Sequence, residues 1–334
     1  MNKICIVGAG RMGAIHAANV AASERAVLGY VVDSDPKRAA TLAMRYGATA
    51  TADSNEPLTD ASVDAVIIAS STDTHADLIE ASAKAGKAIL CEKPIDLSIE
   101  RVRACEQEIE GFDRPVMIGF QRRFDDTHQT VRQAISKGDI GRVESISITS
   151  RDPSPPPHDY IKTSGGQFFD QMIHDFDLAL WMSSATGMAK IFAMGAGLID
   201  PKIVALGDTD SAHVLIEFAT GAFCKIECSR RASYGYDQRV EVFGALGMVC
   251  SNNLHTSAIT KWNVTGTATS ATLQPDFMLR YFPCYAKELE AFLDALEGAS
   301  FTGPSFTAGR RALQLAEAAK QSLDTGQLIN VDLG

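Results

Sequence analysis

The sequence predicts an α/β fold in two parts: a doubly wound parallel sheet, then an α+β domain with a large, mostly antiparallel, open-faced sheet. Short apolar runs alternate with helix-like segments over about the first 120 residues, as strands buried on both faces do. A glycine-rich turn directly follows the first of these runs. After residue 190, strand-like runs succeed one another without long helices between them, which favours antiparallel pairing.

Bulk composition limits the class of protein. The 334 residues suffice for two domains with a sizeable core, and 46% hydrophobic with 22% charged residues is typical of a globular chain. The formal net charge of −10 argues against a nucleic-acid partner or an anionic membrane surface. There is no signal-peptide layout and no apolar run as long as a membrane span. Seven scattered cysteines favour buried free thiols in a reducing cytoplasm and no metal site.

The first chemical pattern is the G-x-G-x-x-G of Gly8, Gly10 and Gly13, between an expected strand over 3–7 and an expected helix over 14–22. The first two glycines allow a tight turn and close approach of the backbone to a pyrophosphate. The third lets helix and strand pack closely, and the helix N-terminus faces the phosphates. With the strand before it and the helix after it, the pattern predicts a dinucleotide site.

The next apolar run, 26–32, ends in Asp33, where a carboxylate accepts hydrogen bonds from an adenosine ribose. Ser34 and Asp35 follow it, and no arginine stands directly after Asp33. The carboxylates would repel the 2′-phosphate of NADP, so NAD is favoured as the cofactor. Arg38 is the nearby cation that reduces this repulsion. As an alternative Asp33 caps the following helix, over 36–46, although Ser34 or Asp35 suits that role better.

Strands expected over 63–69, 87–91 and 115–119 continue the alternation, with helices reaching 85 and 110. The polar loop 70–75 follows the first of these strands, where a nucleotide passes in a doubly wound sheet. Because crossovers are right-handed, these strand ends should face one crevice.

Lys93 stands in Glu92-Lys93-Pro94, directly after the strand over 87–91. A lysine there projects over the reactive end of a cofactor, where it can hydrogen-bond a substrate hydroxyl and lower the pKa of that hydroxyl. The alternative is an ordinary surface ion pair in a loop, and the position after this strand counts against it.

The second half opens with an expected helix over 126–137 and a strand over 143–150. Three consecutive prolines then predict a rigid extended loop over 151–160. Asp152, His158 and Tyr160 in this loop are candidate substrate contacts, and a plain connector is an equally good interpretation for each of them.

Asp170 and His174 lie four residues apart after a Gly-Gly turn, in a helix expected to reach 182. On one helix that spacing places both side chains on the same face. An aspartate beside an imidazole holds its tautomer and stabilises its protonated form, as a general base requires. The alternative is a helix N-terminus with a favourable Asp170 and a merely packed His174.

The remaining segments form the expected second sheet, with one face left for a partner subunit. Tyr236 lies in a turn of this region and can present a phenol to a substrate. Two helices, over 285–296 and 307–323, should close the chain. The strands are expected over 191–195, 212–219, 222–229, 238–244, 247–251 and 258–262.

Together the patterns Gly8–Gly13, Cys91-Glu92-Lys93-Pro94 and Asp170-x-x-x-His174 resemble the glucose–fructose oxidoreductase/inositol dehydrogenase (Gfo/Idh/MocA) family along essentially the whole chain. The resemblance implies a Rossmann domain over 1–120, and a substrate-binding and oligomerisation domain over 121–305. The helix over about 306–324 would pack back on the first domain. Lys93, Asp170 and His174 would be the catalytic residues.

Within this family the chain is most similar to the inositol dehydrogenase branch, in the stretches 122–125, 150–153, 173–177 and 234–237. This implies NAD-dependent oxidation of a secondary alcohol on a cyclic polyol, with myo-inositol as the expected substrate. Ser150-Arg151-Asp152 replaces a His-Arg-Asn found in some members, which leaves another inositol isomer or a pyranose open. A non-catalytic NAD-binding sugar sensor is the alternative from another class.

These patterns and the resemblance together predict a set of contacts and a homo-oligomer, a dimer or a homotetramer, formed through the second sheet. Expected cofactor contacts are Gly8, Gly10, Arg11, Met12, Asp33, Ser34, Arg38, Ser70, Ser71, Thr72, His75, Glu92, Lys93 and Arg123. Expected substrate contacts are Lys93, Asp152, Tyr160, Asp170, His174 and Tyr236.

Overall fold

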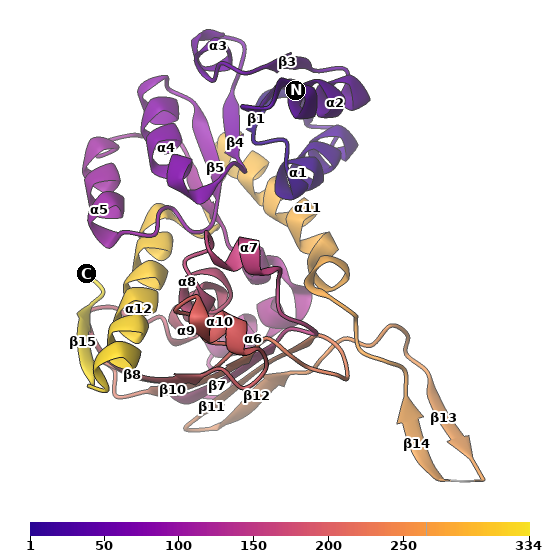
Figure 1. The fold of residues 1–334 in the computed structure, drawn as a ribbon, viewed down its shortest axis with the longest axis vertical. Coiled ribbons are helices and arrows are strands. Elements are labelled where there is room, and N and C mark those ends of the chain that lie inside the picture. The colour runs from indigo at the N-terminus through magenta and orange to yellow at the C-terminus, as the bar shows by residue number, and fades with distance from the viewer. Residues whose placement is uncertain (265) are drawn as a thin grey trace. The chain divides into compact units, whose positions relative to one another are not determined.

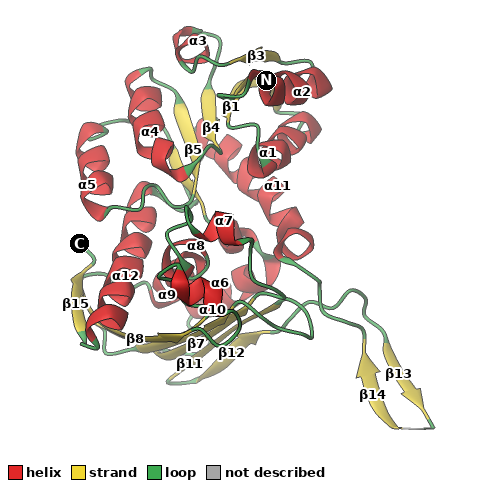
Figure 2. Cartoon of the chain, in the orientation of Figure 1, coloured by secondary structure: helices red, strands yellow, loops and turns green. Residues whose placement is uncertain are grey.

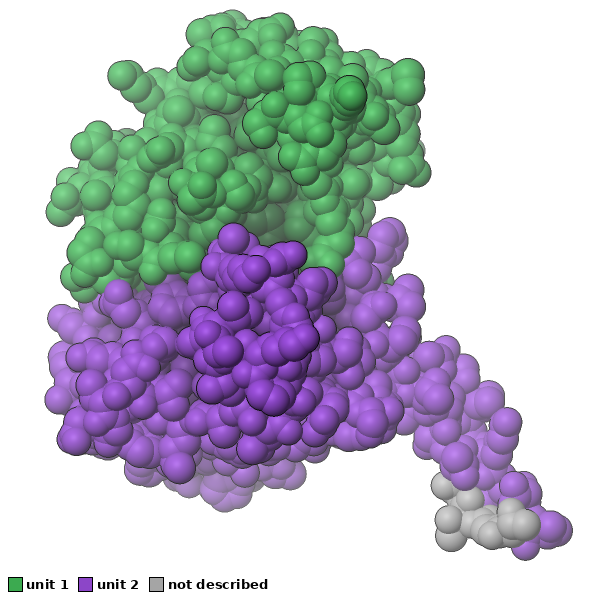
Figure 3. All heavy atoms as spheres, in the orientation of Figure 1, with its two compact units in different colours: residues 1–124, 283–310 green, residues 125–282, 311–334 purple. Residues whose placement is uncertain are grey.

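The computed structural model describes residues 1–264 and 266–334. The chain forms two compact units (Figures 1 and 3). Unit 1 comprises residues 1–124 and 283–310, and unit 2 comprises residues 125–282 and 311–334. Figure 2 shows that each unit combines helices with a sheet. No helix within the described residues is both long and apolar enough to cross a membrane.

Unit 1 contains a six-stranded sheet in the order β3-β2-β1-β4-β5-β6, with every pair parallel. This is the doubly wound order that the sequence predicts. The strands consist largely of buried β-branched and leucine residues, which is why they lie between two layers of helices. They are β1 (Asn2–Val7), β2 (Ala26–Val32), β3 (Thr49–Thr51), β4 (Ala65–Ile68), β5 (Ala88–Glu92) and β6 (Val116–Gly119).

In unit 1, the helix after β2 has a cap at each end. Asp35 accepts a hydrogen bond from the backbone N–H of Lys37 at 2.9 Å and caps α2, so Asp33 is not the cap. Gly47 ends the same helix with a φ of 69°. The helices are α1 (Arg11–Ala22), α2 (Pro36–Tyr46), α3 (Asn55–Thr59), α4 (His75–Lys84) and α5 (Ile99–Glu108), with 3₁₀ turns at Thr72–Thr74 and Gln121–Phe124.

The segment that returns to unit 1 is 283–310, which differs from the expected 306–324. It contains most of α11 (Phe277–Leu296), whose Leu289, Phe292 and Leu293 are buried. Arg25 pairs at 2.8–2.9 Å with Glu290 and Asp294 on this helix and with Glu297, the residue that follows it. Most of α12 (Phe306–Thr325) belongs to unit 2, where the backbone N–H of Ala193 donates to Ser322 at 3.0 Å.

Unit 2 is built on a seven-stranded sheet in the order β12-β11-β7-β10-β9-β8-β15. Only the β7–β10 pair is parallel, so the sheet is mostly antiparallel as predicted. Its strands are β7 (Val143–Arg151), β8 (Met188–Ala196), β9 (Ser211–Phe218), β10 (Phe223–Ser229), β11 (Asp237–Gly244), β12 (Gly247–Ser251) and β15 (Ile329–Asp332).

Side chains alternate strictly across this sheet. In β9 and β10, Val214, Ile216, Cys224 and Ile226 are buried, whereas the residues between them face outward. Besides most of α12, the helices of unit 2 include α6 (Asp126–Lys137), α7 (His158–Ile161), α8 (Gln167–Asp170), α9 (Ile173–Ser183) and α10 (Pro201–Ala205). Figure 1 shows them gathered on one side of the sheet, so no helix formed by the described residues of this unit covers its other face.

Three local predictions for unit 2 differ from the structure. The strand expected over 258–262 is β13 (Thr260–Asn263), which pairs with β14 (Gly266–Ser270) in a separate hairpin. The expected extended loop over 151–160 contains α7, which begins at His158, the first residue after the prolines. The single helix expected to reach 182 is broken, because α8 ends at Asp170 and α9 begins at Ile173.

Candidate active site

The glycine-rich turn after β1 leaves room above its middle glycine. A Cβ at Gly8 (φ 101°) would lie 2.4 Å from the carbonyl oxygen of Ala69, and one at Gly13 would lie 1.8 Å from that of Gly8. Nothing lies within 4 Å of the Cβ position at Gly10. Packing therefore requires glycine at positions 8 and 13, whereas Gly10 leaves open space at the surface of the turn.

The N-terminus of α1 directly follows this turn. Gly10 is its N-cap and provides no side-chain hydrogen bond, and the first turn contains no acidic residue. Backbone N–H groups at such an end attract anions. The turn, with the expected contacts Arg11 and Met12 at the start of the helix, thus fits the pyrophosphate of a dinucleotide.

Asp33 is held beside the same turn. It is 8% exposed, and its two carboxylate oxygens accept hydrogen bonds from the backbone N–H groups of Ala9 and Asp35, each at 2.8 Å. The half-exposed guanidinium of Arg38 pairs with Asp33 at 3.1 Å and with Asp35 at 3.6 Å. The Asp33 carboxylate keeps lone pairs that can accept a hydrogen bond from a ribose hydroxyl. Arg38, the cation expected to reduce the repulsion of a 2′-phosphate, is already paired with Asp33 and Asp35.

The loop after β4 is held by His75. One ring nitrogen of His75 lies 2.8 Å from the carbonyl oxygen of Pro94, and the other lies 3.1 Å from that of Ser70. The ring is 2% exposed. His75 therefore connects two loops, and its expected contact with a cofactor stays a prediction. Ser71 is exposed, and Ser70 and Thr72 are partly exposed.

Lys93 follows β5, and its peptide bond to Pro94 is cis. The lysine side chain is partly exposed, as is that of Arg123 after β6. Glu92, by contrast, is buried, and its Oε1 lies 2.8 Å from Nε2 of His16. The structure directs the Glu92 carboxylate to His16, and the expected contact of Glu92 with the cofactor stays a prediction.

The expected catalytic pair of unit 2 lies on two consecutive short helices. Asp170 is the last residue of α8 and accepts a hydrogen bond from the Tyr160 hydroxyl at 2.8 Å. His174 is the second residue of α9 and is 8% exposed. Gly166, with a φ of 88°, precedes α8, and the backbone N–H of Gln167 donates to Asp208 at 2.8 Å. This turn fixes the start of α8, and hence the place of Asp170.

Two other expected substrate contacts have different surroundings. Asp152 is partly exposed, and its backbone N–H donates to Ser229 at 2.9 Å. Tyr236 is buried, and its ring meets that of Tyr281 edge-on, with the centroids 6.0 Å apart. Tyr236 thus forms part of the core of unit 2.

His158, the remaining candidate of the proline-rich loop, is hydrogen-bonded to Asp200 at 2.7 Å. This contact lowers the pKa of the Asp200 carboxyl group.

Two ionisable residues of unit 1 were missed by the sequence reasoning: His16 on α1 and Glu288 on α11. Both occupy the buried stripe of their helix, since Gly13, Ala17 and Val20 are buried with His16, and Leu289 and Phe292 with Glu288. The sequence did contain a signal for both residues, because each is an ionisable residue at a position where the helix periodicity predicts a buried apolar one. Among the described residues, no group of three His, Cys, Asp or Glu side chains is arranged to hold a metal ion.

Comparison with known proteins identifies the family. Residues 2–120 match the model of the oxidoreductase family with an NAD-binding Rossmann fold, and residues 128–250 match that of the GFO/IDH/MocA C-terminal domain. The chain is 46% identical to the inositol 2-dehydrogenase of Rhizobium meliloti (strain 1021), over 98% of both chains. It is 33% identical to the NAD⁺-dependent scyllo-inositol 2-dehydrogenase of Bacillus subtilis (strain 168), over 99% of this chain and 96% of that one.

A solved structure agrees with these relatives. The myo-inositol dehydrogenase of Corynebacterium glutamicum superposes with a TM-score of 0.93 at 37% identity, covering 99% of this chain and 98% of that one. The doubly wound sheet, the glycine turn beside Asp33, and the match of both family models lead to one conclusion. The chain belongs to the GFO/IDH/MocA family of oxidoreductases and has its NAD-binding Rossmann fold.

Proposed function

We propose that this protein is an NAD-dependent inositol 2-dehydrogenase that oxidises myo-inositol to 2-keto-myo-inositol. The observation that carries the proposal is the presence of Lys93, Asp170 and His174 together in a chain similar, from end to end, to inositol 2-dehydrogenases. A sensor that only binds a sugar has no need of all three residues.

In the proposed reaction, His174 takes the proton of the substrate hydroxyl as the general base. Asp170 orients the imidazole and stabilises its protonated form. The Lys93 ammonium hydrogen-bonds the reacting oxygen and favours loss of its proton. When bound, NAD supplies the acceptor for the hydride that leaves the same carbon. The C–H and O–H bonds break, a C=O bond forms, and one proton is released.

Asp152 and Tyr160 are proposed to contact the polyol. Tyr160 is exposed and already donates to Asp170 at 2.8 Å, so the same phenol can orient both the aspartate and a neighbouring hydroxyl. Asp152 occupies a position where some family members have an asparagine. A second candidate substrate, another inositol isomer or a pyranose, is favoured by this difference and by the similarity to a scyllo-inositol enzyme.

A substrate screen tests the function. We expect reduction of NAD with myo-inositol, followed by absorbance at the reduced-nicotinamide band, and a lower kcat/KM with NADP because of Asp33. Scyllo-inositol and common pyranoses are measured in parallel. Turnover of a pyranose but of no inositol would overturn the substrate assignment and leave the class of reaction intact. No turnover of any polyol, with NAD still bound, would favour the sensor.

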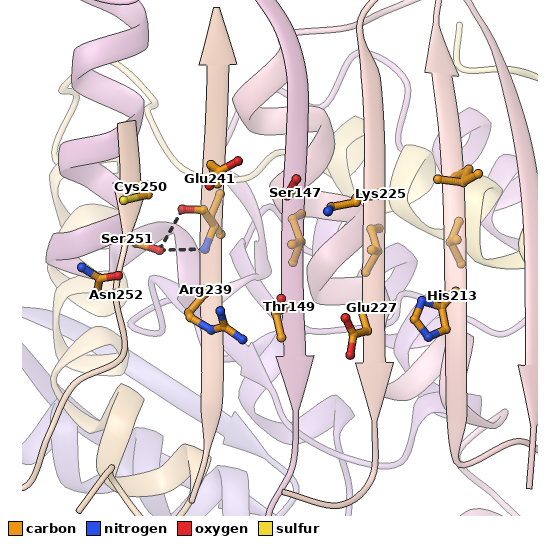
Figure 4. Close-up of a pocket in the computed structure, with 15 residues that line it drawn as sticks. Ser147, Thr149, His213, Lys225, Glu227, Arg239, Glu241, Cys250, Ser251 and Asn252 are labelled. Carbon is orange, nitrogen blue, oxygen red and sulfur yellow. Dashed lines mark hydrogen bonds between the residues drawn. The ribbon is translucent and has the colours of Figure 1, made fainter. Parts of the chain in front are cut away.

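We also propose that the protein is a homo-oligomer, a dimer or tetramer, formed through the outer face of the unit 2 sheet. Figure 4 shows polar side chains from β7, β9, β10, β11 and β12 around a shallow depression on this face. Its volume is about 610 Å³. Apolar side chains also point outward from these strands, and Leu215 and Phe223 are both 59% exposed. Large apolar side chains on a sheet face are typical of interfaces.

Light scattering coupled to gel filtration tests this interface. Leu215→Glu/Phe223→Glu places charges at its centre, and we expect a smaller assembly than that of the wild type. Met44→Glu, an exposed methionine on α2, is the matched control and should leave the assembly unchanged. A double variant with the wild-type mass would place the interface elsewhere. None of the seven cysteines forms a disulfide bond in the described part of the chain, which supports the further proposal of a reducing compartment, the cytoplasm.

A further inference from the structure

A cluster of buried ionisable side chains lies in unit 1, and the reaction proposed above does not use it. His16 comes from α1, Glu92 from the end of β5, and Tyr285 and Glu288 from α11. His16 is 1% exposed and Glu288 is fully buried. A buried charge is unfavourable unless it is paired. The contacts of each side chain in the cluster therefore bear on whether it can carry a charge.

His16 and Glu92 form its hydrogen-bonded pair. Nε2 of His16 lies 2.8 Å from Oε1 of Glu92. Nδ1 of His16 is buried and has no hydrogen-bond partner among the described residues. An unpaired N–H would cost more than an unpaired lone pair. The geometry therefore favours the tautomer of His16 in which Nε2–H donates to the Glu92 carboxyl group.

Glu288 is the neutral member of the cluster. Neither of its carboxyl oxygens has a hydrogen-bond partner among the residues that the structure describes. Burial and then the charge of Glu92 raise the pKa of Glu288 well above its usual value. The pKa of the neighbouring Tyr285 is also raised, by burial first and then by Glu92 and Glu288. A second carboxylate beside Glu92 is thus unfavourable, and Glu288 keeps its proton.

Other groups of the packed helices contribute less. His16 meets the ring of Tyr285 edge-on at 6.1 Å. From the start of α1, the charge of Arg11 opposes the rise in the pKa of Tyr285, whereas Cys284 adds to it. The groups that face Glu288 or its immediate neighbours are Glu92, His16, Arg11, Tyr285 and Cys284.

The cluster matters because Glu92 is joined directly to Lys93. On the other side of Lys93, the carbonyl oxygen of Pro94 lies 2.8 Å from His75. The two chain neighbours of the lysine are thus held by imidazoles from α1 and α4. A Cβ at Gly119, opposite Glu92 in the sheet, would lie only 3.0 Å from Oε2 of Glu92. The Glu92 carboxylate thus lies between the His16 ring and the backbone at Gly119.

We propose that His16 is a positioning residue that acts on Lys93 through Glu92. The role given to His16 rests on the proposed catalytic role of Lys93. Displacement of Glu92 moves the start of the Lys93 loop, and a shift of about 1 Å in a catalytic group can cost about 100-fold in rate.

Steady-state kinetics of His16→Ala, Glu92→Gln and Gly119→Ala test the proposal. We expect kcat to fall by about 10- to 100-fold, with the dissociation constant of NAD, measured by fluorescence, within about twofold of wild type. His16→Gln, which can still donate to Glu92, should recover part of the loss. Asn19→Ala is the control on α1, since its buried side-chain nitrogen has no described hydrogen-bond partner, and should keep wild-type kcat.

The comparison with Lys93→Ala separates two failures. If Lys93→Ala keeps full turnover, the proposed role of the lysine is wrong, and the positioning role falls with it. If Lys93→Ala is inactive while His16→Ala and Gly119→Ala bind NAD and keep wild-type kcat, only the positioning role is wrong. Should His16→Ala fail to fold, Gly119→Ala decides, because it displaces Glu92 without touching α1.

Glu288→Gln tests the neutral carboxyl. An unfolded glutamic acid loses its proton near its usual pKa of about 4.3, whereas the folded one keeps it to higher pH. The wild type therefore loses stability as pH rises through this window, and the glutamine variant does not. We expect its urea midpoint to exceed that of the wild type by a margin that grows from pH 5 to pH 7. The exposed Glu108→Gln is the control, and a margin independent of pH would show that Glu288 is ionised.

Discussion

Replacing His174 with alanine is expected to lower turnover by about 10²–10⁴-fold, the usual contribution of a positioned general base. Nucleotide binding should persist, because the glycine turn and Asp33 belong to unit 1 and His174 belongs to unit 2. His174 is 8% exposed and lies on the first turn of α9. Its replacement therefore removes the base from a helix and leaves the loops of the unit unchanged. The loss should therefore appear mainly in kcat.

The measurement is steady-state turnover of the best substrate, combined with NAD binding followed by fluorescence. His255→Ala is a matched control, since it removes an exposed histidine of the same unit and should keep wild-type turnover. His174→Asn tests shape against chemistry, because asparagine can hydrogen-bond but cannot accept the proton. Undiminished turnover in either His174 variant would exclude this residue as the base.

The parts of the site that follow strand ends were predictable. Gly8, Asp33 and Lys93 each come directly after a buried apolar run, and the carboxyl ends of parallel strands lie at one edge of a sheet. A local pattern is therefore enough to place them. The family resemblance then supplied the roles of Asp170 and His174, which their spacing alone left open.

Tertiary contacts were not predictable in the same way. His16 and Glu92 are 76 residues apart, and Glu288 reaches them only because α11 returns to unit 1. Single-sequence patterns carry no information on such pairings, so the contact of Glu92 with His16 and those of His75 with two backbone carbonyls could not be predicted. Tyr236 was placed in an accessible turn because its sequence neighbours are turn residues, whereas its ring packs on Tyr281.

The missed elements are the short ones. β3, α3, α7, α10, β14 and β15 have three to five residues each. Such segments are too short for a period of 2 or 3.6 to be detected, and their stability comes from the neighbours on which they pack. The break between α8 and α9 is of the same kind, since no glycine or proline stands at residues 171–172 to mark it.

The largest stability effect is expected at a buried ion pair of unit 2, between Asp125 and Arg280. Their side chains are 5% and 2% exposed, and the guanidinium makes two contacts with the carboxylate, one of them at 3.2 Å. Asp125 also accepts the backbone N–H groups of Thr127 and His128 and so caps α6. Burial alone would raise the pKa of Asp125, but His128 and Arg280 outweigh it and the pKa is lowered.

Arg280→Met should lower the free energy of unfolding by about 3–5 kcal/mol, because it leaves a buried carboxylate without its guanidinium. Urea unfolding followed by circular dichroism measures this loss. Asp125→Asn/Arg280→Met should recover part of it, since asparagine is neutral and still caps a helix. Glu144→Gln is the control in the same unit, since Glu144 is a partly exposed carboxylate near Arg142, and its expected change is below about 1 kcal/mol.

The pH dependence separates this ion pair from simple packing. A carboxyl group with a lowered pKa contributes stability above its unfolded pKa of about 3.9, and this contribution is lost as pH falls through the folded pKa. The wild type should therefore lose stability below about pH 4 more steeply than Asp125→Asn/Arg280→Met, which has no titrating group at residue 125. Equal acid slopes, with the same deficit for Arg280→Met at every pH, would mean that Arg280 stabilises unit 2 through its packing and not through its charge.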